Sequence, residues 1–473
     1  MKVLYAASEA YPFIKTGGLA DVAGALPKAL AEAGTEVSVI LPYYQDIPGK
    51  FRADIEFVKK FWVNLSWRNQ YCGLMKTRYG GVDYYFIDNL YYFGRKGLYG
   101  YYDDAERFAF FSRAVLEVLP TIGMPDVIHA NDWQTGMIPV FLDKFYRHKE
   151  AYRDLRVLFT IHNIEYQGVF DPKITEDVLG LGWNDYEDGA IRHGNAVNFM
   201  KAAIRSSSWV STVSPSYAKE ILTPQYGAGL DGELREYREK LSGILNGIDC
   251  TVNDPEKDTA LFSNYGVSKL ASGKKANKKA LQEMLGLSVA DVPMIAIVSR
   301  LVDHKGMGLV ASVLGSLLAE DIQLVVLGTG DWKYEEMFRR AALDHPGKVS
   351  ANILFNSDLA SKIYAAADLL LMPSVSEPCG LSQMIAMRYG TVPVVHEAGG
   401  LKDSVTPRVG ETGNGFCFAA VNAGDMLNVI RQALSLYAEP SEWAKLRKRA
   451  AACDFSWKKP AEEYIGLYEK IKA

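Results

Sequence analysis

The first residues that could do chemistry lie in a short loop that can hold a phosphate group. Residues 15–18 read KTGG, and they join a predicted strand at residues 3–7 to a predicted helix at residues 19–32. A cation and two adjacent glycines at such a turn let backbone N–H groups approach an anion, with a helix N-terminus behind them. The spacing matches neither the dinucleotide fingerprint nor the P-loop. The loop is therefore either a phosphate-binding corner or a turn that only needs glycine.

A second loop with similar chemistry lies in the other half of the chain. Residues 376–381 read SEPCGL and follow a predicted strand at residues 368–372. The proline and the glycine mark the start of a helix whose free N–H groups can hold a diphosphate. Glu377 either projects from the strand end toward a ligand or only interacts with the helix dipole. Cys379 either has thiolate character beside the helix N-terminus or is a small buried filler.

Two basic residues, Arg300 and Lys305, follow a predicted strand at residues 294–299. Together they can neutralise the charge that develops on a departing diphosphate, although basic residues in a loop are usually only solvated. The chain contains no Asp-x-Asp pair to hold a divalent ion against a nucleotide-sugar diphosphate. We therefore expect transfer chemistry without a metal ion, and no cofactor.

Two histidines follow predicted strands. His129 begins the segment HANDW, and His162 lies in the segment TIHN. A histidine at a strand end is either a structural residue held by hydrogen bonds or a group at a ligand site. The sequence shows no partner for either of them, so both interpretations stay open.

Other enzyme classes lack their signatures. Residues 328–331 read GTGD after a predicted strand, but position 333 is Lys where a dinucleotide fingerprint has its third glycine. Binding of a nicotinamide cofactor, and with it a dehydrogenase, therefore loses support. The G-x-S-x-G motif of serine hydrolases and the H-E-x-x-H motif of zinc peptidases are absent as well.

The elements that position these residues alternate between strand and helix. Short β-branched runs are separated by segments of helical period, which indicates parallel sheets with helices on both faces. The runs are residues 37–41, 127–129, 157–161, 210–213, 294–299, 323–327, 352–355 and 368–372. Ligands of such open sheets gather beyond the carboxyl ends of the strands, so two facing sheets would share one cleft.

The chain length of 473 residues suits two domains. The alternating pattern weakens across residues 250–293, which include a lysine-rich stretch, so we place the domain junction there. We expect an N-terminal domain at residues 1–250, a C-terminal domain at residues 251–455, and a C-terminal helix at residues 456–473. No strand follows that helix, so it must pack on a domain that is already built.

Composition and charge argue against several partners. Lys and Arg number 52 and Asp and Glu number 56, a net charge of −4, so no basic field attracts nucleic acid or an anionic membrane. The five cysteines form no C-x-x-C pair, which argues against a disulfide framework or a zinc site and favours a reducing cytoplasm. We expect no signal peptide, because the first apolar run is short, and no membrane span.

The motifs, taken together and in order, closely resemble those of bacterial glycogen synthases and plant starch synthases. The resemblance covers nearly the whole chain. It rests on KTGGLADV from residue 15, HANDW from 129, TIHN from 160, GILNGID from 243, SRL from 299 with KG from 305, and SEPCGL from 376. Single motifs recur among many glycosyltransferases, but KTGGL together with EPCGL is specific to this family.

The resemblance implies the GT-B fold, an α/β architecture of two Rossmann-like domains whose parallel sheets face each other across a deep cleft. The N-terminal domain would serve the acceptor and the C-terminal domain the nucleotide sugar, and the C-terminal helix would cross back to the N-terminal domain. The implied activity is transfer of glucose from ADP-glucose to the non-reducing 4-OH of an α-1,4-glucan such as glycogen. Configuration would be retained and ADP released.

The resemblance also implies roles for individual residues. Glu377 would grip the glucose hydroxyls, and Arg300 and Lys305 would stabilise departing ADP. His162 would support positive charge near C1 of the reacting sugar. Asp132 would lie on the acceptor side, as would Phe93 in the aromatic loop at residues 91–93. Further donor contacts would come from Lys15, Gly17, Gly18, Asp21, Cys379, Gly380, Leu381 and Phe355, the last of these over the adenine where tyrosine would be expected.

Several alternatives remain within this resemblance. The family pattern puts no obvious carboxylate beside His162 to attack the β-face of the donor, so front-face attack is favoured over a covalent intermediate. A synthase that uses UDP-glucose and a sucrose-type synthase are the nearest rivals. A phosphorylase would need a cofactor lysine and a longer chain. A catalytically silent glucan-binding protein is disfavoured, because Lys15, Arg300, Lys305 and Glu377 are all present.

Overall fold

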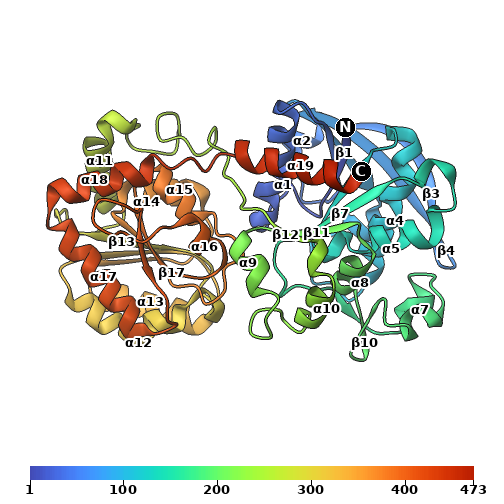
Figure 1. Ribbon diagram of the computed structural model, residues 1–473. Coiled ribbons are helices and arrows are strands. Elements are labelled where there is room, and N and C mark those ends of the chain that lie inside the picture. Colours follow the sequence, from blue (N-terminus) through green and yellow to red (C-terminus); the bar gives the residue numbers. More distant parts are fainter. The chain divides into compact units, whose positions relative to one another are not determined.

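The computed structural model describes all residues from Met1 to Ala473, and the chain folds into two compact units. Unit 1 comprises Met1–Gly247 together with Trp457–Ala473, and unit 2 comprises Ile248–Ser456 (Figure 1). All five cysteines are free thiols. No helix is both long enough and apolar enough to cross a lipid bilayer.

A nine-stranded sheet forms the centre of unit 1, in the order β12-β11-β7-β6-β1-β2-β5-β4-β3. The strands from β12 to β5 run parallel, and a hairpin adds β4 and β3 as antiparallel strands at one edge. The strand order reverses between β1 and β6, which makes this pair the switch point of the sheet. The bounds are β1 Lys2–Ala6, β2 Glu36–Pro42, β3 Glu56–Leu65, β4 Arg68–Tyr79, β5 Val82–Asp88, β6 Val127–Asn131, β7 Arg156–Ile161, β11 Trp209–Thr212 and β12 Leu241–Gly243.

Helices and a small three-stranded sheet complete unit 1. The α-helices are α1 Gly18–Glu32, α2 Gly49–Arg52, α3 Leu90–Phe93, α4 Asp104–Ile122, α5 Met137–Phe141, α6 Ile174–Asp177, α7 Trp183–Glu187, α8 Phe199–Ser206, α9 Pro215–Glu220, α10 Asp231–Glu236 and α19 Lys458–Lys472. The small sheet consists of β8 Val169–Phe170, β9 Arg192–His193 and β10 Ala196–Asn198. Helix α19 packs against α1 and β7, and its Tyr464 and Tyr468 contact the ring of His129 in the core.

Unit 2 contains one parallel sheet of six strands in the order β15-β14-β13-β16-β17-β18. Numbered along the chain this is the order 3-2-1-4-5-6 of a doubly wound nucleotide-binding sheet, with its switch point between β13 and β16. The strands are β13 Met294–Val298, β14 Gln323–Leu327, β15 Val349–Asn352, β16 Leu369–Met372, β17 Val392–His396 and β18 Phe416–Phe418. The helices are α11 Leu270–Met284, α12 Met307–Ala319, α13 Trp332–Asp344, α14 Ser357–Ala366, α15 Ser382–Arg388, α16 Gly399–Ser404, α17 Ala423–Tyr437 and α18 Pro440–Ala451.

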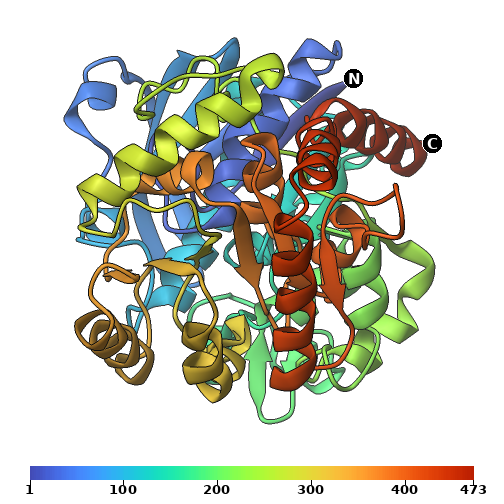
Figure 2. The ribbon, with the colours of Figure 1, turned by 90° about the vertical axis from the view of Figure 1, so that its left-hand side faces the viewer.

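The central strands are apolar along their whole length because both faces of each sheet are covered. In β13, Ile295 and Ile297 belong to one core cluster, whereas Met294 and Ala296 belong to another. Successive side chains of a strand point to opposite faces, so β13 contributes to both cores. Figure 2 turns unit 2 toward the viewer and shows its helices around these strands.

The lysine-rich stretch within the predicted domain junction is a helix of unit 2, for which the sequence analysis predicted no secondary structure. It forms most of α11, on which Lys274 and Lys278 are buried. Lys278 pairs with Asp368 at 2.6 Å, and Lys274 donates to the carbonyls of Tyr364 and Tyr389. These partners are remote in sequence. The residues of the stretch therefore form a polar sequence pattern, although the helix packs against other elements of unit 2.

The predicted strands differ from the structure in two respects. The strand expected at residues 352–355 is wrong by three positions, because β15 spans Val349–Asn352. In the two large sheets, the sequence analysis also predicted no strand at β3, β4, β5, β12, β17 or β18. Much of β3 is solvent-exposed, so it lacks the continuous apolar run that marks a central strand.

Candidate functional site

The loop that carries Lys15 lies at the switch point of unit 1. Strand β1 pairs with β6, so the loop after β1 leaves the sheet beside the loop after β6, which begins with Asp132. Helix α1 starts at Gly18 and no side chain caps it, so the N–H groups of its first turn lack a side-chain partner. Neither Gly17 nor Gly18 has a positive φ, and a Cβ at Gly17 would meet no atom within 4 Å. A need for left-handed backbone therefore does not explain the glycine pair.

Two sets of contacts fix the shape of this loop. Lys15 Nζ lies 2.6 Å from Asp21 Oδ1, and both side chains are about one-third exposed, at 35% and 36%. The backbone N–H and the hydroxyl of Thr16 both donate to the carboxylate of Glu9, which is buried. Burial raises the pKa of Glu9, against the lowering effect of the Thr16 hydrogen bonds. Glu9 is therefore a candidate site residue that the sequence analysis missed.

Asp132 begins the neighbouring loop in a strained conformation. Its φ is 56°, a value that non-glycine residues rarely adopt and that recurs at functional sites. Asp132 Oδ1 accepts a hydrogen bond of 2.7 Å from the backbone N–H of His162. Burial raises the pKa of the Asp132 carboxyl to about 7, although the N–H groups of His162 and Asn163 lower it. A carboxylate therefore lies at the backbone N–H of His162, whereas the expectation that no carboxylate attacks the β-face of the donor stays a prediction.

The hydrogen-bond network fixes the tautomer of His162. Asn131 Nδ2 donates to the carbonyls of Ala6 and His129, so Asn131 Oδ1 is the acceptor for Tyr5 OH at 2.9 Å and for His162 Nε2 at 2.8 Å. His162 therefore carries its proton on Nε2. Burial lowers the pKa of His162 to about 3, so the ring is neutral near pH 7. A neutral ring with a committed N–H can accept a hydrogen bond at Nδ1 but is no general acid.

His129 has a structural environment. Its Nδ1 lies 2.7 Å from Tyr468 OH, and its Nε2 lies 2.6 Å from Thr160 Oγ1. The side chain is fully buried, and burial lowers its pKa well below the usual value. The structure therefore separates the two histidines: His129 joins β6 to α19 within the core, whereas His162 lies at the carboxyl end of β7.

A cavity of about 560 Å³ lies in unit 1 close to this group. Its walls include Trp133, which follows Asp132, and a segment that begins three residues after His162. The lining residues are Tyr101, Asp104, Trp133, Glu165, Tyr166, Gln167, Gly168, Val169, Phe170 and Ala228. Aromatic faces with a few carboxyl and amide groups suit a sugar, because a pyranose presents both C–H faces and hydroxyls.

The switch point of unit 2 brings together two predicted site residues. Lys305 follows β13 and Glu377 follows β16, and Lys305 Nζ lies 2.7 Å from Glu377 Oε2. Ser374 Oγ also donates to Glu377 Oε2, at 2.9 Å. The side chains of Lys305 and Glu377 are only 14% and 8% exposed. Glu377 is therefore not merely a carboxylate that interacts with a helix dipole, because it forms an ion pair with Lys305.

Gly306 permits the close approach of these two loops. Its φ is +76°, and an added Cβ would lie 2.0 Å from the carbonyl oxygen of Pro373. The N–H of Val375 donates to the carbonyl of His304 at 2.9 Å, which ties the loops together again. Arg300 is exposed, and its Nη2 lies 3.4 Å from His304 Nε2.

Hydrogen bonds from the Gln383 side chain hold the loop at residues 379–381. Gln383 Nε2 donates to the carbonyls of Cys379 and Gly380, at 3.2 and 2.8 Å. Gly380 has a φ of +72°, so only glycine fits this turn without strain. The Cys379 side chain is buried, and its Sγ lies 3.4 Å from the Gly380 carbonyl. Burial favours the filler interpretation of Cys379 over that of an accessible thiolate.

The two predicted aromatic contacts have opposite environments. Phe355 is 80% exposed in the loop after β15, so its ring is open to a ligand. Phe93 is fully buried against Tyr44 and Phe110, so its prediction as an acceptor contact is corrected. Tyr91, two residues earlier, is 58% exposed and is the exposed ring of that loop.

Asn246 is a further residue that the sequence analysis did not assign. Its side chain is buried, and Oδ1 has no hydrogen-bond partner. Buried polar atoms are normally satisfied, so an orphan acceptor is a sign of a missing partner such as a ligand hydroxyl. The GILNGID segment contains the residue, but sequence alone does not show that the side chain is buried and unsatisfied.

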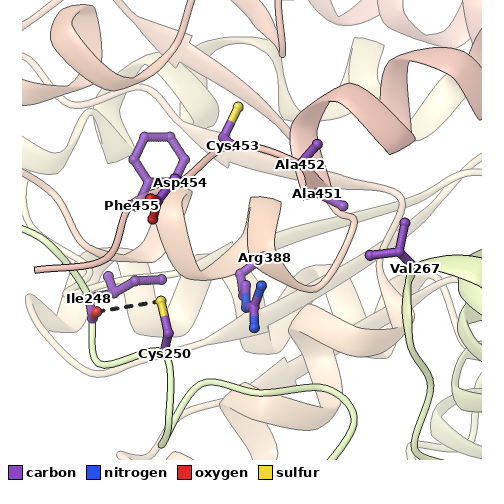
Figure 3. Close-up of a pocket in the computed structure, with 9 residues that line it drawn as sticks. All are labelled: Ile248, Cys250, Val267, Arg388, Ala451, Ala452, Cys453, Asp454 and Phe455. Atoms are coloured by element: carbon purple, nitrogen blue, oxygen red, sulfur yellow. Dashed lines mark hydrogen bonds between the residues drawn. The ribbon is translucent and has the colours of Figure 1, made fainter. Parts of the chain in front are cut away.

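A smaller cavity, of about 270 Å³, lies in unit 2 where the chain enters and leaves that unit. Figure 3 shows its lining, with Cys250 Sγ 3.7 Å from the Ile248 carbonyl. The two connecting segments pair beside it, since the Ile248 N–H donates to the Phe455 carbonyl at 2.8 Å. None of the predicted site residues lines this cavity.

Comparison with known protein families identifies both halves of the chain. Residues 2–236 match the family described as starch synthase catalytic domain, and residues 286–451 match glycosyl transferases group 1. A glycogen synthase of Desulforamulus reducens is 51% identical over 477 aligned residues, covering 100% of this chain and 99% of the relative.

Solved structures agree with this assignment. The catalytic domain of starch synthase IV from Arabidopsis thaliana, bound to ADP and acarbose, matches with a TM-score of 0.92 and 33% identity over 99% of each chain. A sucrose-phosphate synthase from Thermosynechococcus elongatus matches with a TM-score of 0.61 and 17% identity over 99% of this chain and 98% of that one, which concerns the fold alone. The fold is therefore the GT-B type of α/β architecture. The chain belongs to the family of bacterial glycogen synthases and plant starch synthases, and it is a glycosyltransferase.

Proposed function

We propose that this protein transfers glucose from ADP-glucose to the non-reducing 4-OH of an α-1,4-glucan, retains the anomeric configuration and releases ADP. The observation that carries the proposal is the Lys305–Glu377 pair at the switch point of unit 2. A cation for a diphosphate and a carboxylate for sugar hydroxyls lie there within 2.7 Å of each other. Relatives named glycogen synthase, and a starch synthase bound to ADP and acarbose, support the same donor and acceptor classes.

Unit 2 supplies positive charge for the donor diphosphate and hydrogen-bond acceptors for the donor sugar. Lys305 and Arg300 neutralise the negative charge that grows on the departing ADP, which lowers the barrier without a metal ion. Glu377 accepts hydrogen bonds from the glucose hydroxyls. The backbone of residues 379–381 contacts the donor sugar or phosphates, and Phe355 covers the adenine.

Unit 1 supplies the remaining contacts. Lys15, with Gly17 and Gly18, contacts the donor diphosphate and sugar, and Asp21 holds the Lys15 ammonium in place. Asp132 and the 560 Å³ cavity beside it hold the acceptor sugar.

The proposed transfer occurs by front-face attack. The neutral His162 ring cannot protonate the leaving group, so its role is to present electron density near C1 as positive charge develops there. Asp132 is a poor nucleophile, because one of its oxygens accepts the backbone N–H of His162 and because, with a pKa of about 7, part of the carboxyl is protonated near neutral pH. In this reaction the acceptor oxygen bonds to C1 as the C1–O bond to ADP breaks, and the acceptor proton passes to a departing phosphate oxygen.

The donor is tested by the rate of nucleotide release from ADP-glucose and from UDP-glucose, each with and without glycogen. We expect rapid ADP release only when glycogen is present, and slower release of UDP. Faster release of UDP would assign the chain to UDP-glucose. Glycogen binding without any nucleotide release would instead indicate the catalytically silent glucan-binding protein.

The five separate cysteine thiols are consistent with our proposal that the reaction takes place in a reducing cytoplasm.

A further inference from the structure

Aromatic rings are exposed on the outer strands of the unit 1 sheet. Trp62 on β3 is 62% exposed, although tryptophan is usually among the more buried residues. It lies opposite Tyr71 on β4, and the two ring centroids are 6.3 Å apart at an interplanar angle of 85°. Tyr71 is half-buried, so the pair forms an aromatic patch in which Trp62 is the exposed ring, and such a patch can serve as a contact surface.

Tyr71 is connected to the aromatic helix α3. Asn89 Nδ2 donates to the Tyr71 carbonyl at 2.7 Å, and Asn89 Oδ1 caps α3 by accepting the N–H of Tyr92. Helix α3 presents Leu90 and Tyr91 to solvent. Asn89 therefore ties the backbone of the hairpin at Tyr71 to helix α3, which carries the exposed Tyr91.

Cation–ring contacts of Arg95 lead from α3 to the cavity beside His162. The Arg95 guanidinium lies 5.2 Å from the ring centre of Tyr91 and 5.1 Å from that of Tyr101. Tyr101 is one wall of the 560 Å³ cavity. A ring contact, the hydrogen bonds of Asn89 and the Arg95 cation thus lead from Trp62, at the edge of the sheet, to the cavity in which we place the acceptor sugar.

We propose that this aromatic track, formed by Trp62, Tyr71, Tyr91 and Tyr101, binds the body of a linear α-glucan whose end occupies the cavity. The inference rests on the proposed function, because it assumes that the acceptor is a polymer. A cavity of about 560 Å³ holds only a short segment of such a chain, so the rest must pass over the protein surface. Aromatic faces pack against the C–H faces of pyranose rings and tolerate variation in register.

The track is held rigid before any ligand binds. Tyr71 OH lies over Gly73, where a Cβ would come within 2.8 Å of it, so only glycine leaves the ring in this position. Both terminal nitrogens of Arg95 donate to the Asp103 carboxylate at 2.7 Å, which fixes the guanidinium beside Tyr91. Groups ordered in advance lose little entropy on binding, so each ring contributes more to affinity.

A glucan fits this face better than a second copy of the chain. Strand β3 is the free edge of the sheet, where strand addition would join two copies. Its middle carries the exposed Lys59 and Lys60, which repel the same residues of another copy and blunt the edge. A neutral polysaccharide meets no such repulsion.

The experiment compares Trp62→Ala with the unaltered full-length protein on two acceptors, maltotriose and glycogen, at saturating ADP-glucose. We expect the KM for glycogen to rise by about threefold to tenfold, the size of the effect of losing one aromatic contact. The values of kcat and the KM for maltotriose stay the same, because a trisaccharide does not reach Trp62. Trp62→Phe, which keeps a ring, restores most of the affinity.

Trp332→Ala is the matched control, since Trp332 is a 74% exposed tryptophan on α13 of unit 2. It leaves both KM values unchanged. An unchanged KM for glycogen in Trp62→Ala, or an equal change for both acceptors, overturns the track. A shift in molar mass by light scattering without a change in glycogen affinity also overturns it and assigns the face to self-association.

Electrophoresis through gels that contain glycogen separates this inference from the proposed function. If the unaltered protein transfers no glucose, the proposed function fails, but the gels still test the track. Weaker retardation of Trp62→Ala than of Trp332→Ala supports glucan binding by the track. Equal retardation contradicts it.

Discussion

Lys305 and Glu377 form a mostly buried ion pair, although 72 positions separate them and they follow different strands. The pair exists because β13 and β16 are neighbours at the switch point of unit 2, where the loops after both strands leave the same edge. A strand order, and not a local motif, therefore brings this cation and this carboxylate together.

Breaking this pair should reduce both stability and activity. Lys305→Ala or Glu377→Ala leaves a mostly buried charge without its partner, so each lowers the free energy of unfolding by about 3 kcal/mol. The double variant costs less than the sum of the two, as urea denaturation will measure. Glu377→Ala and Lys305→Ala also lose most of kcat.

The exposed pair of Lys333 and Asp303 is the control for this cycle. Its N–O distance is 2.8 Å, close to that of Lys305 and Glu377, but its side chains are 55% and 70% exposed. Solvent screens such a pair, so its alanine variants should show no measurable coupling. Equal coupling in both cycles, or normal turnover of Glu377→Ala, would contradict our account of the buried pair.

Gly306→Ala should separate the two loops that carry Lys305 and Glu377. The new Cβ would meet the Pro373 carbonyl at 2.0 Å, and φ is +76°. We expect a lower Tm and a lower kcat, measured by calorimetry and by ADP release. Gly315→Ala on helix α12 is the control, because its Cβ would meet nothing and alanine favours a helix. Equal effects of the two substitutions would refute the role of Gly306.

Lys15→Ala should raise the KM for ADP-glucose and leave the fold intact. The side chain is partly exposed, and its ion pair with Asp21 lies at the surface, so its loss costs little stability. Initial rates against ADP-glucose concentration measure the effect, and circular dichroism checks the fold. Lys28→Ala, farther along the same helix, serves as the control. An unchanged KM in Lys15→Ala would remove this residue from the donor site.

The predictions from sequence succeeded where glycine and proline mark the loops. The strand at residues 323–327 matches β14 residue for residue, and both loops found by their glycines lie at switch points. Composition could not reveal α11, because Lys274 and Lys278 find their partners on remote elements.

The residues of the candidate site were harder to predict from the sequence than the fold was. Phe93 and Tyr91 belong to one aromatic run, and only the geometry of the short helix α3 decides that Phe93 is buried while Tyr91 is exposed. Glu9 and Asn246 resemble ordinary polar loop residues. What distinguishes them is burial, and burial depends on tertiary packing that a single sequence does not display.

Asp132 should give the protein an ionisation near neutral pH. Burial raises its pKa from 3.8 to about 7, so the folded state binds this proton more tightly than the unfolded chain does. The stabilisation is complete below pH 3.8 and is lost as the pH rises toward 7. In Asp132→Asn this contribution is absent, whereas the hydrogen bond from the His162 N–H is kept.

The comparison of Asp132→Asn with the unaltered protein isolates this group. The His162 ring contributes with the opposite sign, because its lowered pKa removes stability as the pH falls below 6.5, but it is present in both proteins. We expect the free energy of unfolding to fall more, or to rise less, from pH 5 to pH 7 in the unaltered protein than in Asp132→Asn. The same pH dependence in both proteins would mean that Asp132 is ionised throughout.

The central claim is retaining glucosyl transfer from ADP-glucose to an α-1,4-glucan. Proton NMR of a mixture of the protein, ADP-glucose and maltotriose tests it most directly, since it reports the products and the anomeric configuration together. We predict maltotetraose with a new α-1,4 linkage and one ADP for each bond formed. A β-linked product, free glucose in place of maltotetraose, or no consumption of ADP-glucose would contradict the account.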